Sequence, residues 1–103
     1  MKYVKIDIIS DNKKDLETII NKLLNNKLTN NTNIIKTDSY SLNNNIIIST
    51  NNYILTFITR YKSIDEIYKL VDDKNNILII EDITINKNSK DKFEDSTNTP
   101  VFL

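Results

Sequence analysis

Acidic side chains form the clusters in this chain that could hold an ion. Asp72-Asp73 and Glu81-Asp82 could together offer hard oxygen ligands to a divalent cation. The simpler interpretation is that they are solvated acids at a helix end and on a strand, because acids at a helix C-terminus oppose the helix dipole without forming a cage. No spacing typical of a calcium-binding loop accompanies them. We therefore predict no dedicated metal site.

Histidine, cysteine and glycine are absent from the sequence. Their absence removes the usual zinc and copper ligands, the thiolate nucleophile and every histidine general base. The missing glycine also argues against the phosphate-binding loops of P-loop proteins, dinucleotide-binding proteins and acylphosphatases, because those loops depend on glycine. We predict a protein that is not an enzyme, has no catalytic residues and uses no cofactor.

A few aromatic and basic side chains could recognise a ligand or a partner. Tyr40, Tyr53 and Tyr61 lie on or beside a predicted hairpin and could line a pocket or a subunit contact. Ordinary cross-strand pairing explains such tyrosines equally simply. Arg60 is the sole arginine, and a guanidinium at a strand end could clamp a carboxylate or a phosphate. A surface arginine without a ligand is the alternative.

Charge and hydropathy limit the partners. The 14 basic and 14 acidic residues balance, and no basic block exceeds Lys13-Lys14, so nucleic acid is not an expected partner. No apolar run is long enough to span a bilayer, and the alternating N-terminus does not resemble a signal peptide. We therefore predict a cytoplasmic protein with no membrane contact. The excess of Ile, Asn, Lys and Tyr is typical of an AT-rich genome.

The first elements predicted by hydrophobic periodicity are a strand and a helix. Residues 3–9 alternate between apolar and polar side chains, as a half-buried strand does. Ser10 or Asp11 can then cap a helix whose apolar side chains form one stripe. The stripe consists of Leu16, Ile19, Ile20, Leu23, Leu24 and Leu28.

A long hairpin should follow. Residues 33–42 read as a strand, and Asn43-Asn44-Asn45 supplies the reversal because asparagine tolerates left-handed dihedral angles. The return strand covers residues 46–59, with a bulge or a second turn expected at Thr50-Asn51-Asn52. We expect this hairpin to carry subunit assembly, since two helices can cover only one face of the sheet.

The remaining elements complete an α+β, ferredoxin-like βαββαβ sandwich, with two helices on one face of an antiparallel sheet. A capping box at Ser63-Ile64-Asp65-Glu66 predicts a helix that ends by Asp73. Residues 77–85 should form a last strand, apolar enough at its start to be central. The domain is thus predicted to span residues 1–85. Residues 86–103 form a polar tail, expected to be dispensable for folding but to aid assembly through Val101-Phe102-Leu103.

Short segments resemble the CutA family, small trimeric proteins linked to divalent-cation tolerance. Lys27 to Ile35 keeps the outer residues of the family's K-L-A-A-C-V-N-I-I signature. Tyr40 to Ile46 resembles Y-x-W-x-G-x-I, with Leu42 for the tryptophan and Asn44 for the glycine. Ile54 to Arg60 is similar to L-L-I-I-K-T-R, with Ile58 for the lysine. Asn31 replaces the family's cysteine, and its H-P-Y-E-V-P segment has no counterpart before the last strand.

The resemblance implies a homotrimeric, non-catalytic binding or sensing protein associated with divalent-cation tolerance. Asn33, Tyr40, Tyr53 and Arg60 are then the candidate ligand-binding residues, for a small ligand or a weakly bound divalent cation. Tight copper binding is not expected, since neither imidazole nor thiolate is available. The alternative from another class is a small viral or host-interaction protein that binds a partner protein at the edge of its sheet.

Overall fold

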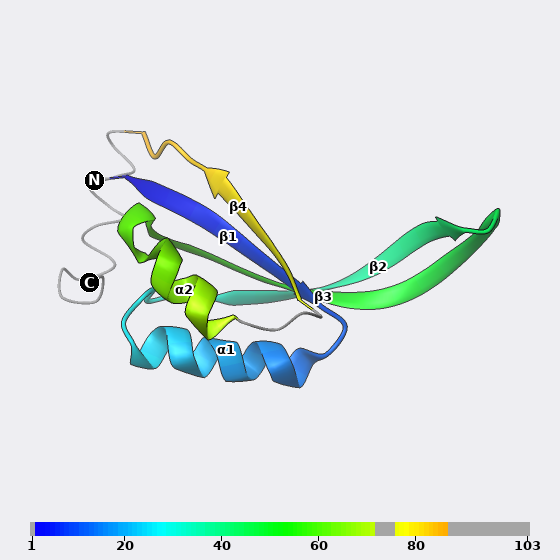
Figure 1. The fold of residues 1–103 in the computed structure, drawn as a ribbon, viewed down its shortest axis with the longest axis horizontal. Helices are drawn as coiled ribbons and strands as arrows, with labels where there is room; N and C mark the ends of the chain where they lie inside the picture. Colours follow the sequence, from blue (N-terminus) through cyan, green and yellow to red (C-terminus); the bar gives the residue numbers. More distant parts are fainter. Residues whose placement is uncertain (1, 72–75, 87–103) are drawn as a thin grey trace.

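The computed structural model describes residues 2–71 and 76–86 of the chain. Its four-stranded antiparallel sheet has the order β2-β3-β1-β4, and both helices lie on one face of it (Figure 1). The predicted α+β, ferredoxin-like arrangement is confirmed. In chain order the elements are β1 (Tyr3–Ser10), α1 (Lys13–Asn25), β2 (Asn33–Asn43), β3 (Ile46–Arg60), the 3₁₀ turn η1 (Tyr61–Ser63), α2 (Ile64–Leu70) and β4 (Ile77–Asp82).

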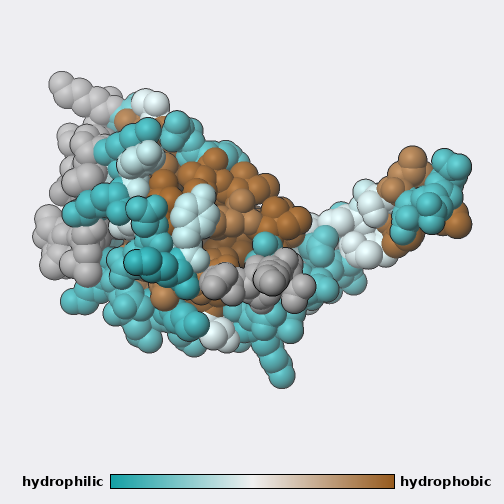
Figure 2. Space-filling view, in the orientation of Figure 1, coloured by the Kyte–Doolittle hydropathy of each residue, from teal (hydrophilic) through white to brown (hydrophobic). Residues whose placement is uncertain are grey.

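Strands β2 and β3 extend well past the rest of the sheet. Strand β1 pairs with β3 only from Tyr53 to Arg60, so residues 46–52 of β3 pair with β2 alone within the described ranges. We call this two-stranded part, residues 37–52, the arm. In Figure 2 the arm is pale toward its outer half and carries both brown apolar and teal polar side chains at its tip. The exposed apolar side chains of the tip are Tyr40, Leu42, Ile46, Ile47 and Ile48.

The arm is one uninterrupted hairpin. Asn44 and Asn45 have φ angles of 50° and 63°, the left-handed values that a two-residue hairpin turn needs, so the predicted reversal is confirmed. The bulge or second turn expected at residues 50–52 does not form. Strands β2 and β3 stay paired in one register through these residues. The Asn52 side-chain amide donates to Ser39 Oγ at 2.9 Å, and Thr37 Oγ1 donates to the Asn52 carbonyl at 3.4 Å. These polar residues stabilise the pairing that they were expected to interrupt.

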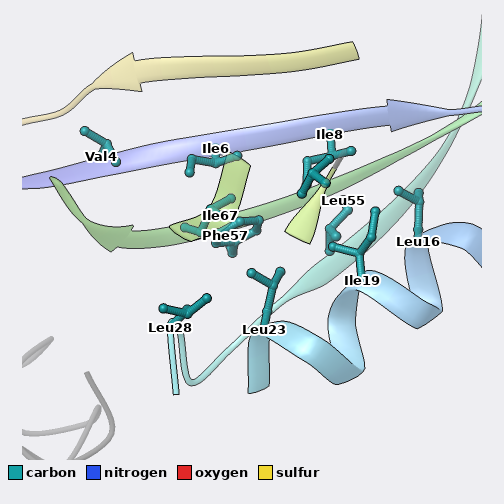
Figure 3. Close-up of a cluster of buried hydrophobic side chains, with 11 residues drawn as sticks. Val4, Ile6, Ile8, Leu16, Ile19, Leu23, Leu28, Leu55, Phe57 and Ile67 are labelled. Atoms are coloured by element: carbon teal, nitrogen blue, oxygen red, sulfur yellow. The ribbon is translucent and has the colours of Figure 1, made fainter. Parts of the chain in front are cut away.

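The hydrophobic core lies between the sheet and the helices (Figure 3). Alternate side chains of β1 and β3 enter it from above, and Leu16, Ile19 and Leu23 of the predicted stripe enter it from below. Leu24, also predicted for the stripe, is instead 39% exposed. Each fully buried aliphatic side chain contributes about 1.5–3 kcal/mol relative to an exposed one. The core therefore explains why β1 and α1 follow their sequence periods. Its buried residues are Val4, Ile6, Ile8, Leu16, Ile19, Leu23, Leu28, Leu55, Phe57, Ile67 and Val71.

The N-cap of helix α1 lies one residue after Asp11 and two after Ser10, the two predicted caps. Asn12 is the N-cap, and its Oδ1 accepts a hydrogen bond from the Lys14 amide at 3.0 Å. Ser10 instead accepts from the Asn12 amide at 3.1 Å, which shapes the turn before the helix. The prediction of Ser10 or Asp11 as the cap is therefore wrong. Three neighbouring residues could each cap a helix, and the direction in which β1 delivers the chain selects among them.

The C-terminus of α1 forms a Schellman-type end without glycine. The Leu28 amide donates to the Leu23 carbonyl at 3.0 Å, and the Lys27 amide donates to the Leu24 carbonyl at 3.1 Å. Lys27 occupies the left-handed region, with φ of 55°, where glycine is usual. Leu28 lies beyond the helix but is only 2% exposed, so its packing against the core helps to hold this turn.

The second half of the chain departs from the predicted boundaries. The 3₁₀ turn η1 directly precedes α2, and Ser63 makes no side-chain capping bond. The predicted capping box therefore does not form. Helix α2 ends at Leu70. Strand β4 ends at Asp82 and lies at the edge of the sheet, which overturns the predicted central position. Ile77 and Ile79 are 59% and 41% exposed. The apolar run at the start of β4 therefore belongs to an edge strand with one exposed face, not to a central strand.

The predicted division into a domain at residues 1–85 and a tail at 86–103 stays a prediction. The described elements all lie within the proposed domain, and β4 is the last of them. Residues 87–103, including Val101-Phe102-Leu103, lie outside the described residues. No helix in the described ranges is long and apolar enough to cross a membrane.

Candidate functional site

The face of the sheet opposite the helices, which we call the open face, carries a row of isoleucines. Strand pairing places Ile35 beside Ile54, Ile54 beside Ile9, and Ile9 beside Ile77, so one residue from each strand contributes. Ile35 and Ile77 are 50% and 59% exposed, whereas Ile9 and Ile54 are half-buried. We call these four residues the isoleucine row. An apolar band across a whole sheet is typical of a surface that another surface covers.

A cavity of about 190 Å³ lies near this row. One of its walls is the loop between α1 and β2, and the other residues come from strands β1, β2 and β3. Phe57 belongs to the helix-side core, whereas Lys5, Thr56 and Ile58 lie at open-face positions of the sheet. The lining residues are Lys5, Thr29, Asn30, Asn31, Asn33, Thr56, Phe57 and Ile58.

Two buried threonines clasp the cavity loop to the end of β3. Thr29 Oγ1 donates to the Ile58 carbonyl at 2.9 Å, and Thr59 Oγ1 donates to the Leu28 carbonyl at 2.6 Å. The two side chains are 1% and 0% exposed, so the backbone carbonyls they satisfy are shielded from water. Thr29 Oγ1 also lies 3.3 Å from the Asn31 carbonyl, which shapes the loop itself. These two hydrogen bonds hold the loop that forms one wall of the cavity against the end of β3.

The charges near the cavity centre on Lys5. Its Nζ lies 3.9 Å from Asp7 Oδ1, which makes an ion pair but not a hydrogen bond. Asp7 Oδ1 is itself buried and has no hydrogen-bond partner. On the other side, Glu81 lies opposite Lys5 in the β1–β4 register and is exposed. Lys5 is therefore the cation of the cavity. The carboxylate of Asp7 lies at a long distance from it, and Glu81 lies on the adjacent strand.

The four residues predicted to bind a ligand lie in different parts of the molecule. Asn33 lines the cavity. Tyr40 is 72% exposed on the arm, Tyr53 packs against the core, and Arg60 lies opposite Tyr3 at the far end of β3. The structure therefore brings none of the other three to Asn33. Their role in binding stays a prediction.

Lys5, Thr29 and Thr56 were missed as cavity residues. The period-two pattern of residues 3–9 already assigns Lys5 to the outer face of its strand, which is the signal that could have found it. Nothing local distinguishes Thr29 or Thr56 from other threonines. Their proximity depends on the pairing of β3 with both β1 and β2, which brings residues far apart in the chain together.

The acidic residues do not form a cluster in the described ranges. No group of three or more His, Cys, Asp or Glu side chains that could hold a metal ion occurs within residues 2–71 and 76–86. Glu81 and Asp82 are consecutive on β4, so their side chains point to opposite faces of the sheet. Asp72 and Asp73, the other members of the considered cluster, lie outside the described residues.

No protein-family model and no curated sequence matches the chain. Solved structures do match it along almost all of its length. CutA1 from Ehrlichia chaffeensis is 22% identical over 100% of this chain and 99% of its own, with a TM-score of 0.74. CutA1 from Oryza sativa is 14% identical over 94% of each chain, with a TM-score of 0.73. The fold is that of the CutA proteins. A periplasmic divalent cation tolerance protein CutA from Archaeoglobus fulgidus adds 18% identity, 92% and 97% coverage and a TM-score of 0.69.

The CutA-like segments of the sequence occupy distinct parts of this fold. Lys27 to Ile35 forms the end of α1, the cavity loop and the entry to β2. Tyr40 to Ile46 forms the tip of the arm, and Ile54 to Arg60 is the part of β3 that pairs with β1. Asn31, which replaces the family's cysteine, lines the cavity. Within the first of these segments, three of the replaced residues, Thr29, Asn30 and Asn31, line the cavity.

Proposed function

We propose that this chain is a CutA-like, non-catalytic binding or sensing protein that works as a homotrimer and is associated with divalent-cation tolerance. The observation that carries the proposal is the isoleucine row on the open face of a CutA fold. Neighbouring structures are named divalent cation tolerance proteins, which supports the functional association. The absence of His and Cys from the sequence supports a non-catalytic role.

Assembly follows from the surface that a single chain leaves uncovered. Ile35 and Ile77 of the isoleucine row and the apolar side chains at the tip of the arm are exposed in the single chain, whose two helices lie on the other face of the sheet. Burying aliphatic side chains between subunits is favourable by about 25 cal/mol per Å² of apolar surface removed from water. A closed, symmetric oligomer is the usual way to cover such surfaces in identical chains. The subunit number of three comes from the CutA likeness.

Light scattering after gel filtration tests this proposal directly. The intact chain should run as a trimer, and Ile54→Asp should yield a smaller particle because it places a charge in the centre of the isoleucine row. Asn21→Asp, at an exposed position of α1, is the matched control and should leave the particle unchanged. If Ile54→Asp leaves the particle size unaltered, the role assigned to the open face is wrong.

Copper should bind weakly or not at all. Scattered carboxylates give at best millimolar affinity, and the sequence offers neither imidazole nor thiolate. Any effect on divalent-cation tolerance would then be indirect. Calorimetry that finds a saturable copper site of micromolar affinity would refute this part of the proposal. A cytoplasmic location also stays a proposal, since one structural neighbour is described as periplasmic.

The alternative function is the binding of a partner protein at the edge of the sheet. Strand β4 is an edge strand whose Ile77 and Ile79 are exposed, and such an edge can accept a further strand. This alternative requires the open face and β4 to be free in solution. A monomeric particle in the same light-scattering experiment would favour it over the trimeric protein.

A further inference from the structure

We propose that the cavity beside Lys5 binds a small organic carboxylate, not a metal cation. The inference rests on the proposed function as a binding protein, because it names the ligand class of that function. It is carried by the cavity's size, by the groups that line it and by the charge at its side.

The cavity is large enough for an aromatic ring. Its volume is about 190 Å³, and an engineered cavity of about 150 Å³ is enough to hold benzene. Ile58, at an open-face position of β3, offers an apolar side chain to such a body. A ligand of about this size can keep its apolar part against the strand and direct its polar part toward the loop.

The polar groups of the cavity suit a carboxylate. Lys5 supplies a cation with three donors, and Asn30, Asn31 and Asn33 supply side-chain amide groups that can also donate. None of the lining residues is acidic, so a bare divalent cation would meet an ammonium and no carboxylate there. The long 3.9 Å contact with Asp7 leaves the donors of Lys5 available to an anion.

The site is also held in place before a ligand arrives. The bonds from Thr29 to the Ile58 carbonyl and from Thr59 to the Leu28 carbonyl fix the loop against β3. A wall that is already ordered avoids part of the entropy cost of binding. The cavity lies beside the isoleucine row, because Thr56 is two residues from Ile54 on the same face. Assembly through that row would leave the cavity at the border of the interface.

Benzoate is the probe that tests the ligand class, and benzamide is its uncharged control of similar shape. The full-length protein is titrated with each while amide chemical shifts are recorded. Benzoate should bind saturably and shift the amides of Lys5, Asn33, Thr56 and Ile58. Benzamide should bind at least about tenfold more weakly, because a charge-assisted contact to Lys5 is lost. Equal binding of the two, or no saturable shift with benzoate, overturns the proposal.

Charge variants distinguish an anion from a cation by the sign of their effects. Lys5→Gln should weaken benzoate binding at least about tenfold. Glu81→Gln should strengthen it by about two- to fivefold, because it removes an exposed carboxylate near Lys5. Lys36→Gln, an exposed lysine on β2 outside the cavity, is the matched control and should change nothing. The opposite signs for Lys5→Gln and Glu81→Gln would indicate a cation site and overturn the proposal.

Two further measurements keep the outcomes interpretable. Thermal unfolding of each variant confirms that it folds, and Asn33→Ala offers a second, milder change in the cavity wall that should weaken benzoate binding about two- to fivefold. Light scattering on the same samples reports assembly independently of the ligand. A trimer that does not bind benzoate contradicts only the proposed carboxylate site. A monomer that binds benzoate contradicts only the proposed assembly.

Discussion

The two halves of β3 differ in what covers them. From Tyr53 to Arg60 the strand pairs with β1, and as far as Thr56 it also pairs with β2; its side chains alternate between half-buried and buried against the helices. From Ile46 to Asn51 every residue is exposed, although the backbone pairing with β2 is continuous. Backbone pairing and the hairpin turn therefore form this part of the strand although its side chains are not buried. The apolar side chains of β3 become part of a core only where a helix layer lies over them.

The largest effect should come from truncating a buried side chain in the covered half. Leu55→Ala should lower the free energy of unfolding by about 2–5 kcal/mol, because Leu55 is 0% exposed in the core. Ile47→Ala, at a position 73% exposed on the arm, should change it by less than about 0.5 kcal/mol in the isolated chain, so that any larger loss comes from burial between subunits. Urea denaturation at equal protein concentration measures both. Comparable losses for the two variants would show that the arm is buried between chains.

A smaller effect should follow from breaking the threonine clasp. Thr59→Val keeps the shape of the side chain but leaves the buried Leu28 carbonyl without its donor, which should cost about 1–3 kcal/mol of unfolding free energy. Thr50→Val, on the exposed arm, is the matched substitution and should be nearly neutral. The same denaturation experiment compares them. A neutral Thr59→Val would mean that the cavity loop is held by packing of Leu28 alone.

The left-handed residue after α1 offers a stabilising change. Lys27 has a φ of 55°, which costs a non-glycine residue about 1–2 kcal/mol. Glycine would relieve that strain but lose about 0.5–1 kcal/mol through its more flexible unfolded chain. We therefore expect Lys27→Gly to raise the free energy of unfolding by about 0.5–1 kcal/mol. A lower melting temperature in calorimetry would contradict this.

The same substitution at the tip of the arm should have the smallest effect. Asn45 also has positive φ, of 63°, but asparagine tolerates the left-handed region better than lysine does. Asn45→Gly should thus change the free energy of unfolding by less than about 0.5 kcal/mol. Calorimetry beside Lys27→Gly gives the comparison. A gain at Asn45 as large as at Lys27 would show that asparagine relieves none of the strain in the hairpin turn.

Local patterns in the sequence were sufficient to predict the element order. Alternation along residues 3–9, the helical stripe from Leu16 to Leu24 and the asparagine reversal each depend on neighbours in the chain, so they can be read without a tertiary structure. The errors occurred where a local signal had more than one solution. Ser63 could cap a helix with its side chain but is the last residue of a 3₁₀ turn and makes no capping bond. The polar residues at 50–52 could break a strand but pair with β2.

The amino-acid sequence by itself determined the chemistry that is unavailable to this protein, because the absence of histidine, cysteine and glycine needs no structure to interpret. It also determined which face of β1 carries Lys5. Only the tertiary structure decided that Lys5 meets the loop at Thr29 and the strand at Thr56, since these residues are brought together by pairing between distant segments. It likewise decided that β4 lies at an edge, because strand order depends on how the connections cross the sheet.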